Sequence, residues 1–152
     1  MNNIDIYKSS LEISSTHANR LETAIHKLQH LIPFDAHKVQ TLNELDFLYL
    51  ELFGNRFSKL QDYMGSTLFD LCLSYAGDVT DGMTIIDKVN KLIKYNIIDS
   101  EATWREFRKA RNHLAHEYPT QPELTAKYIN ETFGLAKKLL TTHTNIKQFL
   151  TS

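Results

Sequence analysis

A single apolar repeat, from about Leu42 to Tyr75, constrains the fold of this chain more than any other feature. Its apolar residues recur at steps of three and four along this stretch: Leu42, Leu45, Leu48, Tyr49, Leu52, Phe53, Phe57, Leu60, Met64, Leu68, Leu71 and Tyr75. Such steps place side chains on one face of an α-helix, whereas a half-buried strand alternates with a period of two. We therefore expect one long helix here, with its apolar face packed against other helices.

Two glycines, Gly54 and Gly65, lie inside this repeat. A glycine in a helix interior costs up to about 1 kcal/mol relative to alanine, so it weakens a helix without ending it. We expect these glycines to mark places where another helix approaches closely.

The remaining helices are delimited by prolines, glycines and capping residues. An apolar series that is helical from Leu21 ends at Pro33, and residues 76–82 form a loop rich in glycine and aspartate. A short helix is expected from Met83 to about Tyr95, then one toward Pro119 with Asp99 or Ser100 as its N-cap. Trp104 and Phe107 fall on the apolar stripe of that helix, so we expect them in the core. The last helix spans about 123–149.

This pattern predicts an all-α protein, because it shows no convincing strand alternation, internal repeat or linker. Four long helices joined by short loops favour an antiparallel up-and-down four-helix bundle with one additional short helix. A length of 152 residues fits a single domain, residues 1–152.

Composition limits the classes of function. The net charge is −1, so a nucleic-acid surface would have to be a local basic patch. One cysteine, Cys72, excludes an internal disulfide and a cysteine-based zinc site; its apolar context predicts a buried, inert thiol. No signal peptide or membrane-spanning run is recognisable, so we expect a cytoplasmic protein with no membrane partner.

The densest group of chemically active side chains is the segment from Arg111 to Tyr118, which is stopped by Pro119. It contains an arginine, Asn112, His113, His116 and a tyrosine. A guanidinium can hold a phosphate through two parallel hydrogen bonds, and an imidazole can move a proton near neutral pH. Metal-free cleavage of a phosphodiester needs these two groups.

A purely structural explanation of the same segment also exists. Cations in the last turn of a helix offset its dipole, and a tyrosine at a helix end can pack its ring while its hydroxyl meets water. In an unbroken helix His116 would point about 140° away from Arg111, although Tyr118 would share its face. Convergence of Arg111 and His116 would need a frayed helix end or a second subunit.

The segment resembles the motif of the HepT toxins of the HEPN superfamily, which is Arg, four residues, His, one residue, Tyr. Here the motif falls on Arg111, His116 and Tyr118, and Asn112 is the polar residue after the arginine. The stretch 56–62, Arg-Phe-Ser-Lys-Leu-Gln-Asp, is similar to a segment common in this group, although which acidic residue, Asp62 or another, would join the site stays open. Chain length and helix order also agree with a HEPN-like helical domain.

The resemblance implies a metal-independent endoribonuclease with no cofactor and no metal site. Arg111 and His116 would be the catalytic residues, and Asn112 would orient the substrate. Arg108, Lys109 and His113 are candidate RNA contacts, with a solvated basic face as the alternative for Arg108 and Lys109. His26 and His30 are spaced for a shared metal, but no third ligand is recognisable.

The resemblance also implies partners. These are an RNA substrate such as tRNA or mRNA, a second copy in a homodimer, and a minimal nucleotidyltransferase (MNT) antitoxin that AMPylates Tyr118. Two alternatives are kept: a non-catalytic substrate-binding or adaptor subunit of that nucleotidyltransferase, and a helical scaffold. The sequence does not distinguish the RNA target, or whether His116 acts as acid or base.

Overall fold

A computed structural model describes residues 3–114 and 121–152, and every regular element in these residues is a helix. The all-α prediction is therefore confirmed. The elements are α1 (Asn3–Leu28), the 3₁₀ helix η1 (Gln29–Leu31), α2 (Ala36–Gln40), α3 (Glu44–Tyr63), the π-helix η2 (Met64–Leu68), α4 (Phe69–Tyr75), α5 (Ile85–Lys94), α6 (Glu101–Leu114) and α7 (Pro122–Thr151).

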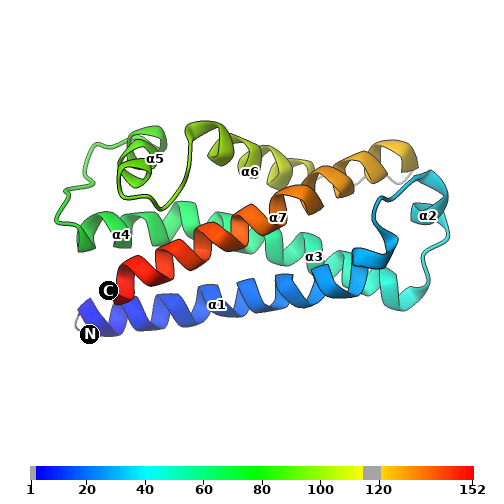
Figure 1. Cartoon of the computed structure of the whole chain (residues 1–152), viewed down its shortest axis with the longest axis horizontal. Helices are drawn as coiled ribbons and strands as arrows, with labels where there is room; N and C mark the ends of the chain where they lie inside the picture. Colours follow the sequence, from blue (N-terminus) through cyan, green and yellow to red (C-terminus); the bar gives the residue numbers. More distant parts are fainter. Residues whose placement is uncertain (1–2, 115–120) are drawn as a thin grey trace.

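The long helices lie along one another (Figure 1). Helix α1 packs against α3 and α7, and α6 packs against α3 and α7. Helix α5 lies near α4 at one end of the molecule, and α2 lies at the opposite end. The start of α1 and the end of α7 lie at the same end, where the Tyr75 hydroxyl donates a hydrogen bond to the Ser152 carbonyl.

The long apolar repeat forms one continuous helical run, in which α3, η2 and α4 follow one another without a break. The run begins after Asn43, whose side chain accepts a hydrogen bond from the Asp46 amide at 2.8 Å. Its π-helical turn was not predicted. This turn contains Gly65, where an added Cβ would lie 3.1 Å from Cζ2 of Trp104, so the expected close helix contact is present.

A second short helix, α2, is present in addition to the expected one. Asp35 caps it, since its carboxylate accepts a hydrogen bond from the Lys38 amide at 2.8 Å. The preceding Phe34 is fixed to α7: its N–H donates to Asn130 Oδ1 at 2.8 Å, and its carbonyl accepts from Asn130 Nδ2 at 3.0 Å. Five residues are too few for a clear apolar repeat, which is why the sequence did not reveal this helix.

The core confirms two sequence predictions. Trp104 and Phe107 are fully buried. Cys72 is also buried, and burial raises the pKa of its thiol to about 12. At neutral pH the side chain is therefore the protonated thiol and not the reactive thiolate. Among the described helices, none has a stretch that is both apolar enough and long enough to span a bilayer.

His143 is not at the surface, although polar residues flank it in the sequence. It is buried in α7, and its Nε2 lies 2.8 Å from the Ser14 hydroxyl of α1. Its position between Leu139 and Ile146 in the buried face of α7 explains the burial, because these residues repeat at helical steps.

Candidate functional site

Arg111, in the last turn of α6, is held by Asp62 of α3 through two hydrogen bonds. Arg111 Nε donates to Asp62 Oδ1 at 2.9 Å, and Nη2 donates to Oδ2 at 3.0 Å. The side chains are 31% and 50% exposed, so the pair borders solvent. Such a bidentate pair fixes the plane of the guanidinium as well as its position.

The pair leaves part of the guanidinium available. Of the five N–H donors of an arginine, Asp62 takes one on Nε and one on Nη2, which leaves three with no hydrogen-bond partner among the described residues. The hydrogen bonds from Arg111 to Asp62 raise the pKa of Arg111 above its ordinary value, so the group stays charged. An oriented, permanently charged fork at the surface can receive an oxyanion such as a phosphate.

The contact between α6 and α3 sets this geometry. Ser100 caps α6, because its hydroxyl accepts a hydrogen bond from the Thr103 amide at 3.1 Å. Trp104 of α6 packs against Gly65 of η2. Two turns further along α6, Arg111 contacts Asp62, which lies one turn before Gly65 and belongs to α3. One helix crossing therefore places both the buried indole and the exposed ion pair.

Two cavities lie on either side of the end of α6. One, of about 1100 Å³, is bounded by α2, α3, α6 and α7, with His113 and Leu114 in its wall. The other, of about 470 Å³, has Arg111 and Asn112 in its wall, together with residues of α3, η2 and α5. The described residues of the Arg111–Tyr118 segment are therefore divided between two cavities.

The other sequence candidates are distributed as follows. Asn112 and Arg108 line the smaller cavity together with Arg111. Lys109 is exposed and borders neither cavity. His113 lies in the larger cavity, stacked on Tyr128 of α7 with ring centroids 3.8 Å apart. His116 and Tyr118 fall in 115–120, outside the described residues.

One basic pair near the larger cavity was not singled out from the sequence. Arg56 of α3 lines that cavity, and its Nη1 donates a hydrogen bond to His17 Nδ1 of α1 at 2.9 Å. Because an arginine only donates, Nδ1 of His17 is the acceptor. Burial, and then the charges of Arg56 and Lys59, lower the pKa of His17. The pairing joins residues 39 positions apart, so no local spacing indicates it.

No group of three histidine, cysteine, aspartate or glutamate side chains in residues 3–114 and 121–152 is arranged to hold a metal ion. His26, in the last turn of α1, and His30, in η1, are the pair considered from the sequence, and both are exposed.

Comparison of the chain with protein-family models, with curated proteins and with solved structures found no match. The resemblance to HEPN proteins is therefore one of sequence motif and expected helix order alone.

Proposed function

We propose that this chain is a HepT-like HEPN toxin, a metal-independent endoribonuclease that uses Arg111 and His116. The observation that carries the proposal is the bidentate pair of Asp62 and Arg111. In this pair a carboxylate of α3 holds the guanidinium of Arg111 through two hydrogen bonds, which supports a role for Asp62 beside the arginine of the proposed Arg-x4-His-x-Tyr motif.

In the proposed reaction the RNA supplies its own nucleophile. The ribose 2′-oxygen attacks the adjacent phosphorus, the new bond closes a 2′,3′-cyclic phosphate, and the bond from phosphorus to the 5′-oxygen breaks. His116 either takes the 2′-hydroxyl proton or gives a proton to the departing 5′-oxygen. The free edge of Arg111 stabilises the charge that develops on the phosphoryl oxygens, and Asn112 beside it orients the substrate.

The architecture supports this proposal in outline. Helices α1, α3, α6 and α7 pack as neighbours, which is compatible with the up-and-down four-helix bundle of the HEPN superfamily. We further propose a cytoplasmic homodimer. A dimer would let Arg111 of one protomer work with His116 of the other, which removes the angular problem within one helix.

The proposal includes a regulatory partner, a minimal nucleotidyltransferase that transfers AMP to Tyr118. The modification would place a bulky anion seven residues after Arg111, where it would compete with the substrate phosphate.

Induction of the chain in a bacterial host tests the proposed activity. We expect wild-type induction to arrest growth and fragment RNA, whereas His116→Ala leaves both unchanged at equal soluble expression. His26→Ala, which changes an exposed histidine of α1, is the matched control and should behave as wild type. Normal growth and intact RNA with the wild-type chain would instead favour the adaptor subunit.

Tyr118→Phe tests the regulatory part separately. The variant keeps the ring and lacks the oxygen that would accept AMP, so we expect it to cut RNA and to arrest growth even when the nucleotidyltransferase is present. Mass spectrometry of the co-expressed proteins should find an AMP adduct on the wild type alone. An inactive Tyr118→Phe would assign the phenol to catalysis and contradict a purely regulatory role.

A further inference from the structure

The smaller cavity beside Arg111 has the size and the charge of an anion-binding site. Its volume of about 470 Å³ lies within the range of small-ligand pockets. Three cations, Lys88, Arg108 and Arg111, line it; Arg111 is paired with Asp62 and Lys88 with Asp70, which leaves Arg108 as the excess positive charge. In a chain whose net charge is −1, this is a local excess of positive charge.

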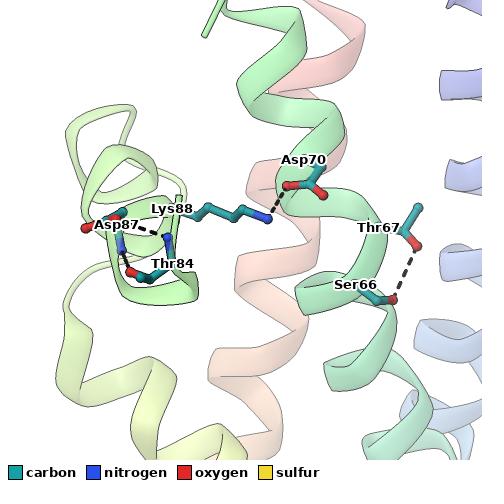
Figure 2. Close-up of polar contacts among 6 residues, drawn as sticks. All are labelled: Ser66, Thr67, Asp70, Thr84, Asp87 and Lys88. Atoms are coloured by element: carbon teal, nitrogen blue, oxygen red, sulfur yellow. Dashed lines mark hydrogen bonds and ion pairs between the residues drawn. The ribbon is translucent and has the colours of Figure 1, made fainter. Parts of the chain in front are cut away.

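Lys88 is held in place from two sides. Thr84 and Asp87 form a capping box at the start of α5. The Asp87 amide donates a hydrogen bond to the Thr84 hydroxyl at 3.1 Å, and the Thr84 amide donates one to the Asp87 carboxylate at 3.0 Å. Figure 2 shows Lys88 reaching from α5 to Asp70 on α4, where its Nζ lies 2.8 Å from Oδ1. Asp70 takes one direction of an ammonium group that has three donors, so Lys88 can also donate to a ligand.

Arg108 faces the same cavity with its charge uncompensated. It lies one turn before Arg111 on α6, is exposed, and forms no ion pair with the described residues. Its neighbour Arg105, by contrast, pairs with Glu101 at 3.4 Å and does not border the cavity. The two arginines thus provide a comparison within one helix.

The wall of the cavity also contains uncharged side chains. Trp104, which is 1% exposed, borders the cavity. The Ser66 hydroxyl, in the π-helical turn, adds a neutral donor to the wall.

We propose that this cavity is a second phosphate-binding subsite, in which Lys88 and Arg108 hold the phosphate next to the one cleaved at Arg111. This inference rests on the proposed function for its RNA substrate, and it adds the residues that bind the neighbouring nucleotide. The chemistry recognised is a phosphate group, which either an RNA strand or a free nucleotide can supply. The subsite assigns roles to α5 and to the π-helical turn, which the Arg-His-Tyr motif does not include.

The tryptophan provides a direct measurement. The chain has a single tryptophan, Trp104, so tryptophan emission reports on the surroundings of this one residue, which include the cavity. We would titrate the full chain with inorganic phosphate, with AMP, and with a 2′-O-methylated oligonucleotide that cannot be cleaved because it has no free 2′-hydroxyl. We expect a saturable change in emission with all three, and the tightest binding with the oligonucleotide.

The variants Lys88→Gln and Arg108→Gln each remove one charge-assisted contact. We expect each to weaken binding of the oligonucleotide about tenfold or more. The matched controls are Lys94→Gln at the end of α5 and Arg105→Gln on α6; both change cations outside the cavity and should bind as wild type. Arg108 is exposed, so its variant stays informative even if loss of the Lys88–Asp70 pair unfolds the other.

Two results would overturn the inference. One is the absence of any saturable emission change with all three ligands, and the other is equal binding by the cavity variants and their controls. AMP binding as tightly as the oligonucleotide would assign the site to a free nucleotide and contradict the RNA subsite. The binding test does not depend on cleavage, so intact phosphate binding with no RNA cleavage would contradict the proposed function alone.

Discussion

At the scale of single residues, the ion pair of Asp62 and Arg111 gives the clearest functional indication. A partly exposed ion pair contributes at most about 1 kcal/mol to stability, so stability alone gives it little importance. Its geometric effect is larger, because two parallel hydrogen bonds fix the direction in which the remaining donors of Arg111 point. We interpret Asp62 as a positioning residue for the arginine.

Asp62→Asn tests this role. The amide has nearly the same shape but no charge, and it can accept only one of the two hydrogen bonds, so Arg111 loses its fixed orientation. We expect RNA cleavage to fall roughly tenfold to a hundredfold, with the loss mainly in kcat, because misplaced catalytic groups cost rate on this scale. The melting temperature should change little.

Asp46→Asn is the matched control for that variant, since it removes a partly exposed carboxylate from the first turn of the same helix α3. It should lose a similar small amount of stability through the helix dipole and keep full cleavage activity. Equal activity of the two variants would show that Asp62 has no part in positioning Arg111.

The buried His143 provides a prediction about pH. Burial, and then the charge of Lys147, lower its pKa from 6.5 to about 4. An unfolded chain therefore binds a proton on this histidine at a higher pH than the folded chain does. The resulting stability is fully present above pH 6.5 and is lost as the pH falls toward 4, by up to about 3 kcal/mol.

Urea unfolding between pH 7.5 and 4.5 measures this effect. His143→Gln should be less stable than wild type at pH 7.5, because Ser14 loses its partner, yet the difference should shrink as the pH falls. His26→Gln, an exposed change on α1, should follow the wild-type profile. A constant difference between wild type and His143→Gln at every pH would contradict the shifted pKa.

At the scale of elements, the π-helical turn η2 is where α6 approaches the long helix. A π-turn inserts one extra residue into a helix, and such turns are frequent at functional sites. Here it carries Gly65 to the Trp104 ring, and the cavity lies beside both. The packing of this turn thus determines where Arg108 and Arg111 emerge from α6.

Gly65→Ala and Gly54→Ala form a matched pair that tests this contact. At Gly65 the new methyl group would lie 3.1 and 3.2 Å from two atoms of a fully buried indole, so Trp104 must shift; we expect a net loss of about 1 to 2 kcal/mol. At Gly54 the nearest atom, Leu114 Cδ2, is at 3.8 Å, an ordinary contact, so alanine should stabilise by up to about 1 kcal/mol.

Thermal and urea unfolding give both values. RNA cleavage should fall with Gly65→Ala and remain with Gly54→Ala, since only the first displaces the α6 contact. Stabilisation by both substitutions would mean that the contact between η2 and Trp104 is looser than described.

The sequence predicted elements well where an apolar repeat was long. The repeat at 42–75 fixed the helical run from Glu44 to Tyr75, and the apolar positions of Trp104 and Phe107 placed them in the core. The sequence did not predict the five-residue helix α2 or the π-helical turn η2. Both are too short to give an apolar repeat of their own. The burial of His143 is hard to read from its polar neighbours and follows from its helical spacing from Leu139 and Ile146.

The site was less predictable than the helices. The motif indicated Arg111, but its partner Asp62 lies 49 residues earlier in the chain. The spacing of residues within one helix does not predict how that helix is aligned against a second helix. The same reason hides Lys88, whose place beside Arg108 depends on how α5 and α6 pack. The pairing of Arg56 with His17 is equally non-local.

At the scale of the whole molecule, the charge distribution supports a confined RNA contact. The chain has 17 lysines and arginines against 18 aspartates and glutamates, so no general attraction to a polyanion is expected. The positive groups that border the smaller cavity, with the oriented Arg111 among them, are where a phosphate backbone would be bound. Under the proposed function, RNA would therefore bind along α6, on the side that faces α3 and α5.

The measurement that tests the central claim most directly is the chemistry of the cleaved ends. Purified wild-type chain and His116→Ala would be incubated with total RNA in EDTA, and the termini of the fragments would be identified. The account predicts fragments with 2′,3′-cyclic phosphate and 5′-hydroxyl ends from the wild type only. Intact RNA with the wild type, equal cutting by both proteins, or cleavage that requires a divalent metal and leaves 5′-phosphates would contradict it.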